Sequence, residues 1–259
     1  MFASWMLGAV WVPTNFRLTP PEVAYLARSS GAAVHIFDPM FPEHQAAAKA
    51  ENPACRLEIC VGDAWDALAA KGPAMGRAAD VAHDHPAWFF YTSGTTGRPK
   101  AGVLTHGQME YVICNHLCDL MPGTTENDVS LVVAPLSHGA GVHALPQVAR
   151  GAATVLLAGE RLDCEEAWQL VERHRVTNMF TVPTILTMLA RHDAVDRYDH
   201  SSLRYVIYAG SPMYRADQKY ALGKLGKAIV DRWSPAGLDA DGFDWSGGET
   251  QQKAGDSRP

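Results

Sequence analysis

The feature that most constrains the fold is the alternation of short apolar runs with amphipathic stretches along the chain. The candidate strands are rich in β-branched, aromatic and aliphatic residues and lie at 9–13, 33–37, 56–61, 88–91, 131–134, 153–157, 178–182 and 203–208. Several are almost continuously apolar, which is typical of strands covered on both faces. The alternation therefore predicts an α/β fold with helices laid on a largely parallel sheet.

Helix signals lie between these strands. Residues 20–29 open with two prolines, which suit a helix start, and residues 165–174 carry apolar side chains at helical spacing behind Asp163. Thr105 is a suitable N-cap for a helix that runs to about Asp119. We expect layered, mixed sheets with flanking helices.

The charge balance and the cysteines argue against two classes of site. The 259-residue chain has 22 Lys and Arg against 28 Asp and Glu, and its formal net charge of -6 has the wrong sign for a sequence-independent grip on nucleic acid. The five cysteines are odd in number and lack the paired spacing of zinc ligands. We expect buried, reduced thiols in a soluble protein of the cytoplasm.

The two ends of the sequence differ from the rest. Residues 1–12 are apolar but too short for a membrane span, and no basic residue precedes them, so we expect a core helix and strand whose upstream portion is missing. Residues 231–259 show no sustained helical or strand period. We expect a poorly ordered tail there, outside the native core.

A hydroxyl-rich, glycine-containing segment follows the apolar run 87–90. Its sequence over residues 91–100 is Tyr-Thr-Ser-Gly-Thr-Thr-Gly-Arg-Pro-Lys. Hydroxyls can donate to phosphate oxygens, glycines let backbone N–H groups approach, and a lysine adds a mobile positive charge. A loop of this kind that joins two strands is suited to hold a polyphosphate. Its candidate phosphate-binding residues are Thr92, Ser93, Gly94, Thr95, Thr96, Gly97 and Lys100.

This segment differs from the common P-loop, because no Ser or Thr follows its lysine and Pro99 would break a helix at that point. The alternative interpretation is a surface turn rich in Thr, Ser and Gly. The full ten-residue string favours the phosphate loop.

With residues 101–106 after it, the string resembles the signature loop of the AMP-binding, adenylate-forming superfamily, which contains acyl-CoA synthetases. The resemblance implies the large N-terminal domain of an acyl-CoA synthetase, incomplete at both ends. It also implies that the loop grips the β- and γ-phosphates of ATP while a carboxylate attacks the α-phosphate, with help from Mg²⁺. A thiol, usually coenzyme A, then displaces AMP. The implied substrates are ATP, coenzyme A and a fatty or other carboxylic acid.

Three further segments resemble the family. Residues 134–141 resemble its second signature block, and this likeness assigns His138 to the acyl site, although a lone histidine in an apolar setting is otherwise typical of a core residue. Residues 181–184 resemble the strand-to-helix turn beside the acyl pocket. Residues 208–213 resemble the small-residue loop against adenine and the acyl chain, which assigns Gly210, Ser211 and Pro212 to that pocket.

The chain also departs from the family pattern. The family's aromatic-Gly-x-Thr-Glu block, which contacts adenine and magnesium, is not found after Val230. The ribose-binding aspartate segment, the hinge and the small C-terminal domain with its catalytic lysine are not found either. The resemblance therefore implies a partial adenylation domain over residues 1–230, a tail over 231–259 and no C-terminal domain. It names no catalytic residue and no metal ligand.

Two functions follow from these patterns. The first is an AMP-forming acid–thiol ligase, inactive or much impaired as this chain, whose acid and oligomeric state the sequence leaves open. The second is a nucleotide-binding module without turnover. A purely structural scaffold would leave the hydroxyl-rich loop unexplained.

Overall fold

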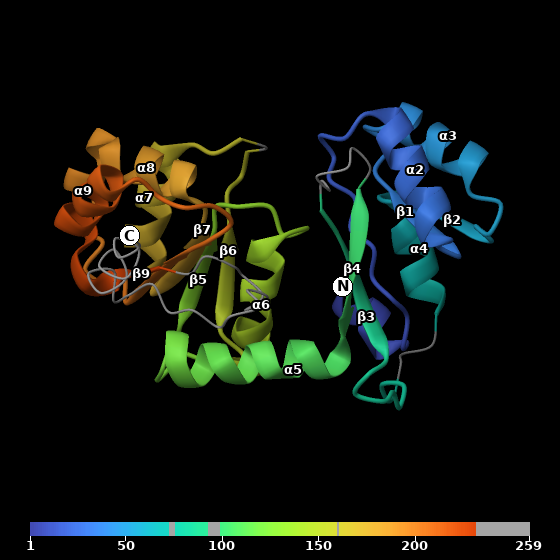
Figure 1. Ribbon diagram of the computed structural model, residues 1–259, viewed down its shortest axis with the longest axis horizontal. Helices are drawn as coiled ribbons and strands as arrows, with labels where there is room; N and C mark the ends of the chain where they lie inside the picture. Colours follow the sequence, from blue (N-terminus) through green and yellow to red (C-terminus); the bar gives the residue numbers. More distant parts are fainter. Residues whose placement is uncertain (73–75, 93–98, 160, 232–259) are drawn as a thin grey trace, which may run out of the picture. The chain divides into compact units, whose positions relative to one another are not determined.

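The computed structural model describes residues 1–72, 76–92, 99–159 and 161–231, and Figure 1 shows their helices and strands. The chain divides into two compact units, Met1–Gln108 and Met109–Pro259. Helices alternate with strands in both units, so the predicted α/β fold is confirmed.

The first unit combines a parallel pair of strands with an antiparallel pair. Strand β1 pairs with β2 in parallel, and β3 pairs with β4 in antiparallel orientation. Its elements in chain order are α1 (Phe2–Met6), α2 (Pro20–Ser30), β1 (Val34–Phe37), α3 (Pro42–Glu51), β2 (Leu57–Cys60), α4 (Asp63–Lys71), β3 (Pro86–Thr92) and β4 (Lys100–Thr105).

Helix α2 begins where the sequence predicted. Thr19 and Glu22 form a capping box, in which the carboxylate of Glu22 accepts a hydrogen bond from Thr19 N at 2.7 Å. The two prolines follow in the first turn, where a missing N–H costs nothing. Gly31 ends the helix with a positive φ of 58°.

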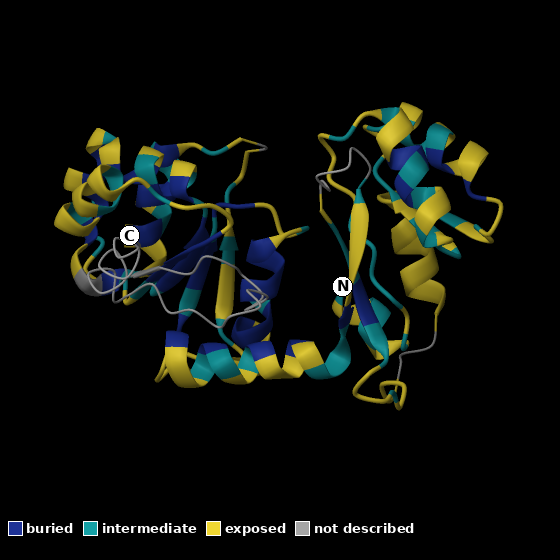
Figure 2. Ribbon diagram, viewed as in Figure 1, coloured by how far each residue is buried: buried dark blue, intermediate teal, exposed yellow. Residues whose placement is uncertain are grey.

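The expectation of a core helix and strand in residues 1–12 is wrong in two respects. Helix α1 has no buried residue; its residues are intermediate or exposed, the teal and yellow classes of Figure 2. The predicted strand 9–13 is only a single parallel bridge between Trp11 and Trp88. Pro13 has no N–H to donate, so it cannot extend that ladder.

The phosphate-loop segment connects two strands, as expected. Strand β3 ends at Thr92 and β4 starts at Lys100, and these two residues are register partners in the antiparallel ladder. The sequence patterns did not indicate β4, because Gly102 interrupts its apolar pattern. A β-hairpin therefore carries the loop.

The second unit contains a five-stranded parallel sheet in the order β6-β5-β7-β8-β9. Its elements in chain order are the π-helical turn η1 (His116–Leu120), β5 (Val129–Val132), α6 (Gly139–Arg150), β6 (Ala153–Leu156), α7 (Cys164–His174), β7 (Asn178–Thr181), α8 (Pro183–Arg191), η2 (Asp193–Asp196), β8 (Tyr205–Tyr208), α9 (Arg215–Leu225), η3 (Gly226–Ala228) and β9 (Ile229–Asp231).

Helices cover both faces of this sheet (Figure 1). Met179, Val206 and Tyr208 belong to a core cluster with apolar residues of α7, α8 and α9. Their neighbours Phe180 and Ile207 belong to a second cluster with residues of α6 and η1. Successive strand residues point to opposite faces, so both core layers come from the same strands.

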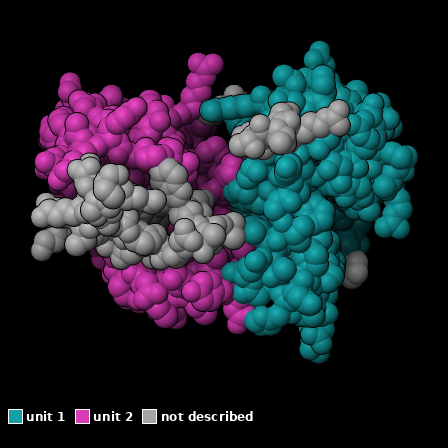
Figure 3. Space-filling view, viewed as in Figure 1, with its two compact units in different colours: residues 1–108 teal, residues 109–259 magenta. Residues whose placement is uncertain are grey.

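Helix α5 (His106–Asn115) begins directly after the predicted N-cap, Thr105. Thr105 Oγ1 accepts from Gln108 N at 3.3 Å, and Gln108 Oε1 accepts from Thr105 N at 2.9 Å. The boundary between the two units, which Figure 3 colours separately, falls within this helix. Asp163 likewise caps α7 by accepting from Glu165 N at 2.9 Å.

The predictions for residues 231–259 and for the cysteines need correction. Asp231 is the last residue of strand β9, which the sequence patterns did not reveal, whereas the rest of the predicted tail, 232–259, lies outside the described residues. All five cysteines are free, but only Cys164 is buried. The prediction of buried thiols was wrong for the other four, of which Cys55 and Cys60 are partly exposed and Cys114 and Cys118 are exposed.

Candidate functional site

The base of the hairpin loop is anchored to helix α2 from both strands. The hydroxyl of Tyr91, in β3, donates to Ser29 Oγ at 3.1 Å, and the hydroxyl of Tyr25 donates to Pro99 O, just before β4, at 3.1 Å. Thr92 and Lys100 are exposed at the ends of the paired strands. The hairpin therefore presents one predicted hydroxyl and the predicted lysine side by side.

The remaining phosphate-binding candidates cannot be placed. Ser93, Gly94, Thr95, Thr96 and Gly97 lie outside the described residues. Their assignment stays a prediction from the sequence.

The carboxyl edge of the parallel sheet holds the other candidates. The chain runs from β5 outward to β6 and returns to β7 on the other side of β5, so the connections diverge between β5 and β7. In open α/β sheets a ligand crevice forms outside the carboxyl ends of the strands at such a point. His138 follows β5 and occupies the N-cap position of α6, and Val182 follows β7 and occupies the N-cap position of α8.

The small-residue loop leaves the same edge one strand further along. Gly210, Ser211 and Pro212 follow β8 and are exposed. Because β7 lies between β5 and β8, the ends of those two strands are separated by two strand spacings, about 10 Å. The structure thus places His138 and the loop on one edge of one sheet.

Gly210 has a structural reason to be glycine. Its φ is +95°, a conformation that L side chains rarely adopt, and a Cβ atom there would lie 3.7 Å from Val182 Cγ1. That separation is an ordinary contact, so backbone conformation and not space is the constraint. The tight turn brings the backbone of this loop beside the β7–α8 turn.

His138 is neutral near pH 7. The side chain is half-buried, and burial lowers its pKa below the ordinary value. A neutral imidazole at the start of α6 offers a hydrogen-bonding group without a full positive charge. It can orient a polar ligand group at the edge of the sheet.

A buried polar cluster beneath α6 was missed by sequence reasoning. It consists of His143, Gln147 and Asn178, each at most 3% exposed. His143 Nε2 lies 2.9 Å from Asn178 Oδ1, and Asn178 Nδ2 donates to Gln147 Oε1 at 3.3 Å. The available signal was the pair of polar residues four apart in an otherwise apolar helical stretch.

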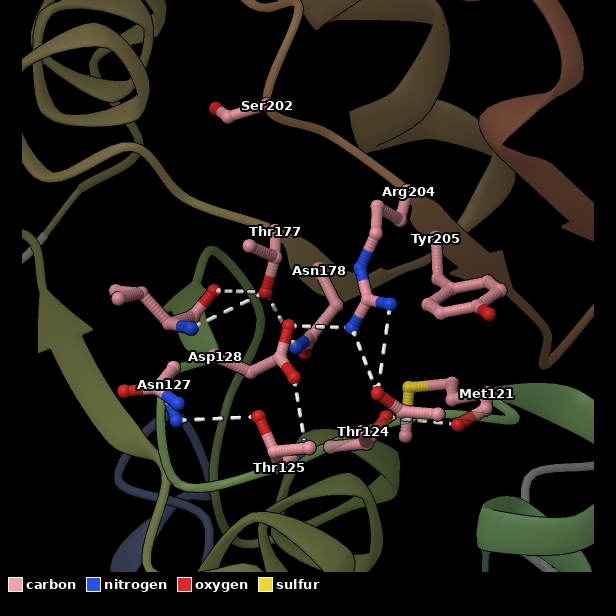
Figure 4. Close-up of polar contacts among 12 residues, drawn as sticks. Met121, Thr124, Thr125, Asn127, Asp128, Thr177, Asn178, Ser202, Arg204 and Tyr205 are labelled. Atoms are coloured by element: carbon pink, nitrogen blue, oxygen red, sulfur yellow. Dashed lines mark hydrogen bonds and ion pairs between the residues drawn. The ribbon is translucent and has the colours of Figure 1, made fainter.

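The opposite, amino-terminal edge of the sheet carries a second polar cluster (Figure 4). Asp128 precedes β5, Thr177 precedes β7 and Arg204 precedes β8. Asp128 accepts from Thr125 N at 2.8 Å and from Arg204 Nη2 at 2.5 Å. These contacts tie three strands together on the side away from the candidate ligand edge, so we assign them to stability.

Within residues 1–72, 76–92, 99–159 and 161–231, no group of three or more His, Cys, Asp and Glu could hold a metal ion. Among the same residues, no helix has the length and apolar character needed to cross a bilayer.

Comparison with known proteins gives a family match and similar curated proteins. The family model described as "AMP-binding enzyme" matches residues 1–236. The chain is 34% identical over 238 residues to 4-coumarate–CoA ligase 5 of Oryza sativa subsp. japonica, covering 88% of this chain and 43% of the relative. It is 36% identical over 215 residues to a feruloyl-CoA synthase of an Amycolatopsis species, covering 82% of this chain and 41% of the relative.

Solved structures show the same architecture. The inhibitor-bound N-terminal domain of FACL13 from Mycobacterium tuberculosis superimposes with a TM-score of 0.77 at 26% identity, covering 89% of this chain and 57% of that domain. The chain spans less than half the length of the two curated relatives named in the preceding paragraph.

Proposed function

Because this chain belongs to the AMP-binding enzyme family, we propose that it is part of an AMP-forming acid–thiol ligase that activates a carboxylic acid with ATP and transfers the acyl group to coenzyme A. The observation that carries the proposal is the family match over residues 1–236, joined to a hairpin that presents Thr92 and Lys100. The names of the curated relatives, a coumarate ligase and a feruloyl-CoA synthase, support an acid substrate.

The hairpin loop is proposed to hold the β- and γ-phosphates of ATP. Lys100 supplies positive charge, and Thr92, Ser93, Thr95 and Thr96 supply hydroxyl donors. Hydrogen bonds to charged oxygens contribute about 1.5 to 3 kcal/mol each. Neutralising the pyrophosphate makes it a better leaving group when the acid carboxylate oxygen attacks the α-phosphorus. Gly94 and Gly97 allow the backbone to approach.

The carboxyl edge of the sheet is proposed to hold the acid and the adenine. His138 orients the acid near its carboxylate, and the exposed loop of Gly210, Ser211 and Pro212 packs against the nucleotide and the acid. Holding both reactants at one edge removes part of the entropic barrier to their reaction. The thiol of coenzyme A then attacks the acyl carbon of the acyl-adenylate, and AMP leaves.

Magnesium assistance is part of the proposal only for the whole enzyme. The described residues do not form a carboxylate cluster suited to Mg²⁺, so no step is assigned to the metal in this chain. A cytoplasmic location is proposed because the substrates ATP and coenzyme A occur there, and the five free thiols suit a reducing compartment.

Calorimetric titration with ATP and with pyrophosphate tests the phosphate site. We expect the Thr95→Ala, Lys100→Ala double variant to bind both at least about tenfold more weakly, because it loses a hydroxyl donor and a charge. Lys71→Ala removes an exposed lysine from α4 and serves as the control. Unchanged ATP affinity in the double variant would move the site elsewhere.

The second candidate is a nucleotide-binding module without turnover. It requires only a nucleotide site such as the hairpin, in which Thr92 and Lys100 are register partners. Carboxylate-dependent pyrophosphate release that Lys100→Ala abolishes would support the ligase in this chain. ATP binding without any release would support the module.

A further inference from the structure

Three polar side chains lie in register across one face of the parallel sheet. Ser130, on β5, is the register partner of Thr154 on β6 and of Asn178 on β7. Asn178 and Phe180 are two residues apart on β7, so their side chains point to the same face. Phe180 belongs to the core cluster that includes Ala140 of α6. The polar row therefore lies on the face that α6 covers.

A small cavity adjoins this row. It has a volume of about 10 Å³, which is close to the space that one water molecule needs. Its walls come from α6, β5, β6 and β7, and they include His143, Ser130 and Thr154. Ser130 is 2% exposed, whereas Thr154, on the edge strand β6, is exposed. Because an exposed residue forms part of its wall, the cavity can exchange water with the solvent.

One buried nitrogen at this cavity needs a partner. His143 is 3% exposed, and its Nδ1 atom has no hydrogen bond to any described residue. A buried polar atom without a hydrogen bond costs free energy, so such an atom indicates a water molecule or another small polar group beside it. The adjoining cavity offers the space for that group.

The hydrogen bonds around His143 determine what this nitrogen can do. The hydroxyl of Thr177 donates to Val129 O at 3.2 Å, so its oxygen accepts from Asn178 Nδ2 at 3.3 Å. This orientation turns Asn178 Oδ1 toward His143 Nε2, at 2.9 Å. Gln147 Nε2 lies 3.4 Å from the same nitrogen, a longer and weaker contact. Because Asn178 Oδ1 can only accept, Nε2 carries the hydrogen and Nδ1 carries a lone pair.

We infer that the cavity is a hydration site for one ordered water molecule, which donates a hydrogen bond to His143 Nδ1 and is also bonded to the hydroxyls of Ser130 and Thr154. Buried waters make about three hydrogen bonds, and these three groups supply that number. The volume leaves no room for a larger ligand. A hard cation does not suit the site, because an imidazole and two hydroxyls bring no negative charge.

The water joins helix α6 to strands β5 and β6. Asn178 holds one ring nitrogen of His143 from β7, and the water holds the other, so the orientation of the ring is fixed from both sides. Helix α6 also begins at His138, which occupies its N-cap position at the carboxyl edge of the sheet. The hydration site thus supports the helix that presents His138. It depends on packing alone and does not require the proposed ligase activity.

A crystal structure of the 259-residue chain tests the site directly. We expect the electron density of an ordered water at about 2.7 to 3.2 Å from His143 Nδ1. Nitrogen-15 NMR of the imidazole tests the same contact in solution. Near pH 7, Nε2 should carry the hydrogen, and the Nδ1 resonance should show the upfield shift of a lone pair that accepts a hydrogen bond.

A cavity-filling variant should displace the water. Ala144→Val adds methyl groups to the cavity wall and leaves His143 in place. The water density should disappear, and the Nδ1 resonance should move downfield, toward that of a nitrogen without a hydrogen bond. Ala149→Val makes the same change at an exposed position of α6 and should keep both the density and the native resonance.

The native chain alone can overturn the inference. A crystal structure that shows ordered waters elsewhere but no density in this cavity would do so, and so would a hydrogen on Nδ1 in the NMR spectrum. An Nδ1 resonance that is the same in the native chain and in Ala144→Val would also contradict it. If Ala144→Val does not fold, the native density and the native tautomer decide the question.

Discussion

Arg204 Nη2 lies 2.5 Å from Asp128 Oδ1, which joins the residue before β8 to the residue before β5 across the intervening strand β7 (Figure 4). The Asp128 side chain is 5% exposed, whereas that of Arg204 is 41% exposed. The carboxylate therefore depends on its partners, because little water can reach it.

Removing the arginine should destabilise the second unit. We expect Arg204→Met to lower the free energy of unfolding by about 2 kcal/mol, less than for a fully buried pair because Arg204 is partly solvated. Urea unfolding measures the change. Arg191→Met breaks a more exposed pair with Asp217 and should cost less than about 1 kcal/mol. Equal losses in the two variants would contradict the role assigned to Asp128.

Acid should destabilise the protein through His143 before it does so through Asp128. Burial, reinforced by His116, lowers the pKa of His143 to about 3. In the unfolded chain the His143 imidazole is protonated below about pH 6.5, whereas in the folded chain it stays neutral down to about pH 3. The free energy of unfolding therefore falls as the pH drops from about 6.5 toward 3. One such group contributes at most about 1.4 kcal/mol per pH unit.

Asp128 acts at lower pH. Burial acts to raise its pKa, but hydrogen bonds from Thr177, Thr125 and Arg204 outweigh burial and lower it. Its contribution to stability is present above the ordinary carboxyl pKa and is lost as the pH falls below that value.

The pH dependence of urea unfolding tests the prediction for His143. Urea midpoints measured against pH should show a shallower slope between pH 6 and 4 in His143→Leu than in the native chain. Parallel slopes would show that His143 does not titrate as described.

The anchors of the hairpin loop should matter for nucleotide binding. The Tyr25→Phe, Tyr91→Phe double variant removes the hydrogen bonds to Pro99 O and Ser29 Oγ. We expect ATP affinity to fall about three- to tenfold, because the loop base loses its orientation, with a small change in melting temperature. Calorimetry and thermal unfolding measure the two effects.

A matched control exists in the second unit. The hydroxyl of Tyr205 donates to Pro122 O at 2.6 Å, so Tyr205→Phe loses a comparable hydrogen bond. ATP affinity should not change in that variant. If it falls as much as in the double variant, the anchors have no specific role.

A side chain at Gly210, in the turn after β8, should destabilise the protein. Gly210→Ala forces alanine to a φ of +95°, and we expect a loss of about 1 to 2 kcal/mol in unfolding free energy. Gly223→Ala is the control, because it lies within α9 and its new Cβ would meet nothing within 4 Å. That change should stabilise by about 0.5 to 1 kcal/mol. A stabilised Gly210→Ala variant would contradict the strained turn.

Local patterns were enough for much of the fold. The helix starts at Thr19, Thr105 and Asp163 depend on groups a few residues apart, so the sequence indicated them directly. Continuous apolar runs likewise revealed strands β5, β7 and β8, which are covered on both faces. The strand expected at 9–13 failed because pairing depends on a partner far along the chain.

The sequence by itself determined the fold class and the family, because both follow from patterns of residues at fixed spacing. It also predicted phosphate binding by the segment 91–100 from the hydroxyls, glycines and lysine of that segment. Tertiary structure alone decided that β3 and β4 bring Thr92 beside Lys100, and that Asn178 and His143, far apart in the sequence, meet beneath α6. It also decided which polar groups are buried. Burial and pairing arise when strands and helices from distant segments pack together, and no local pattern contains that information.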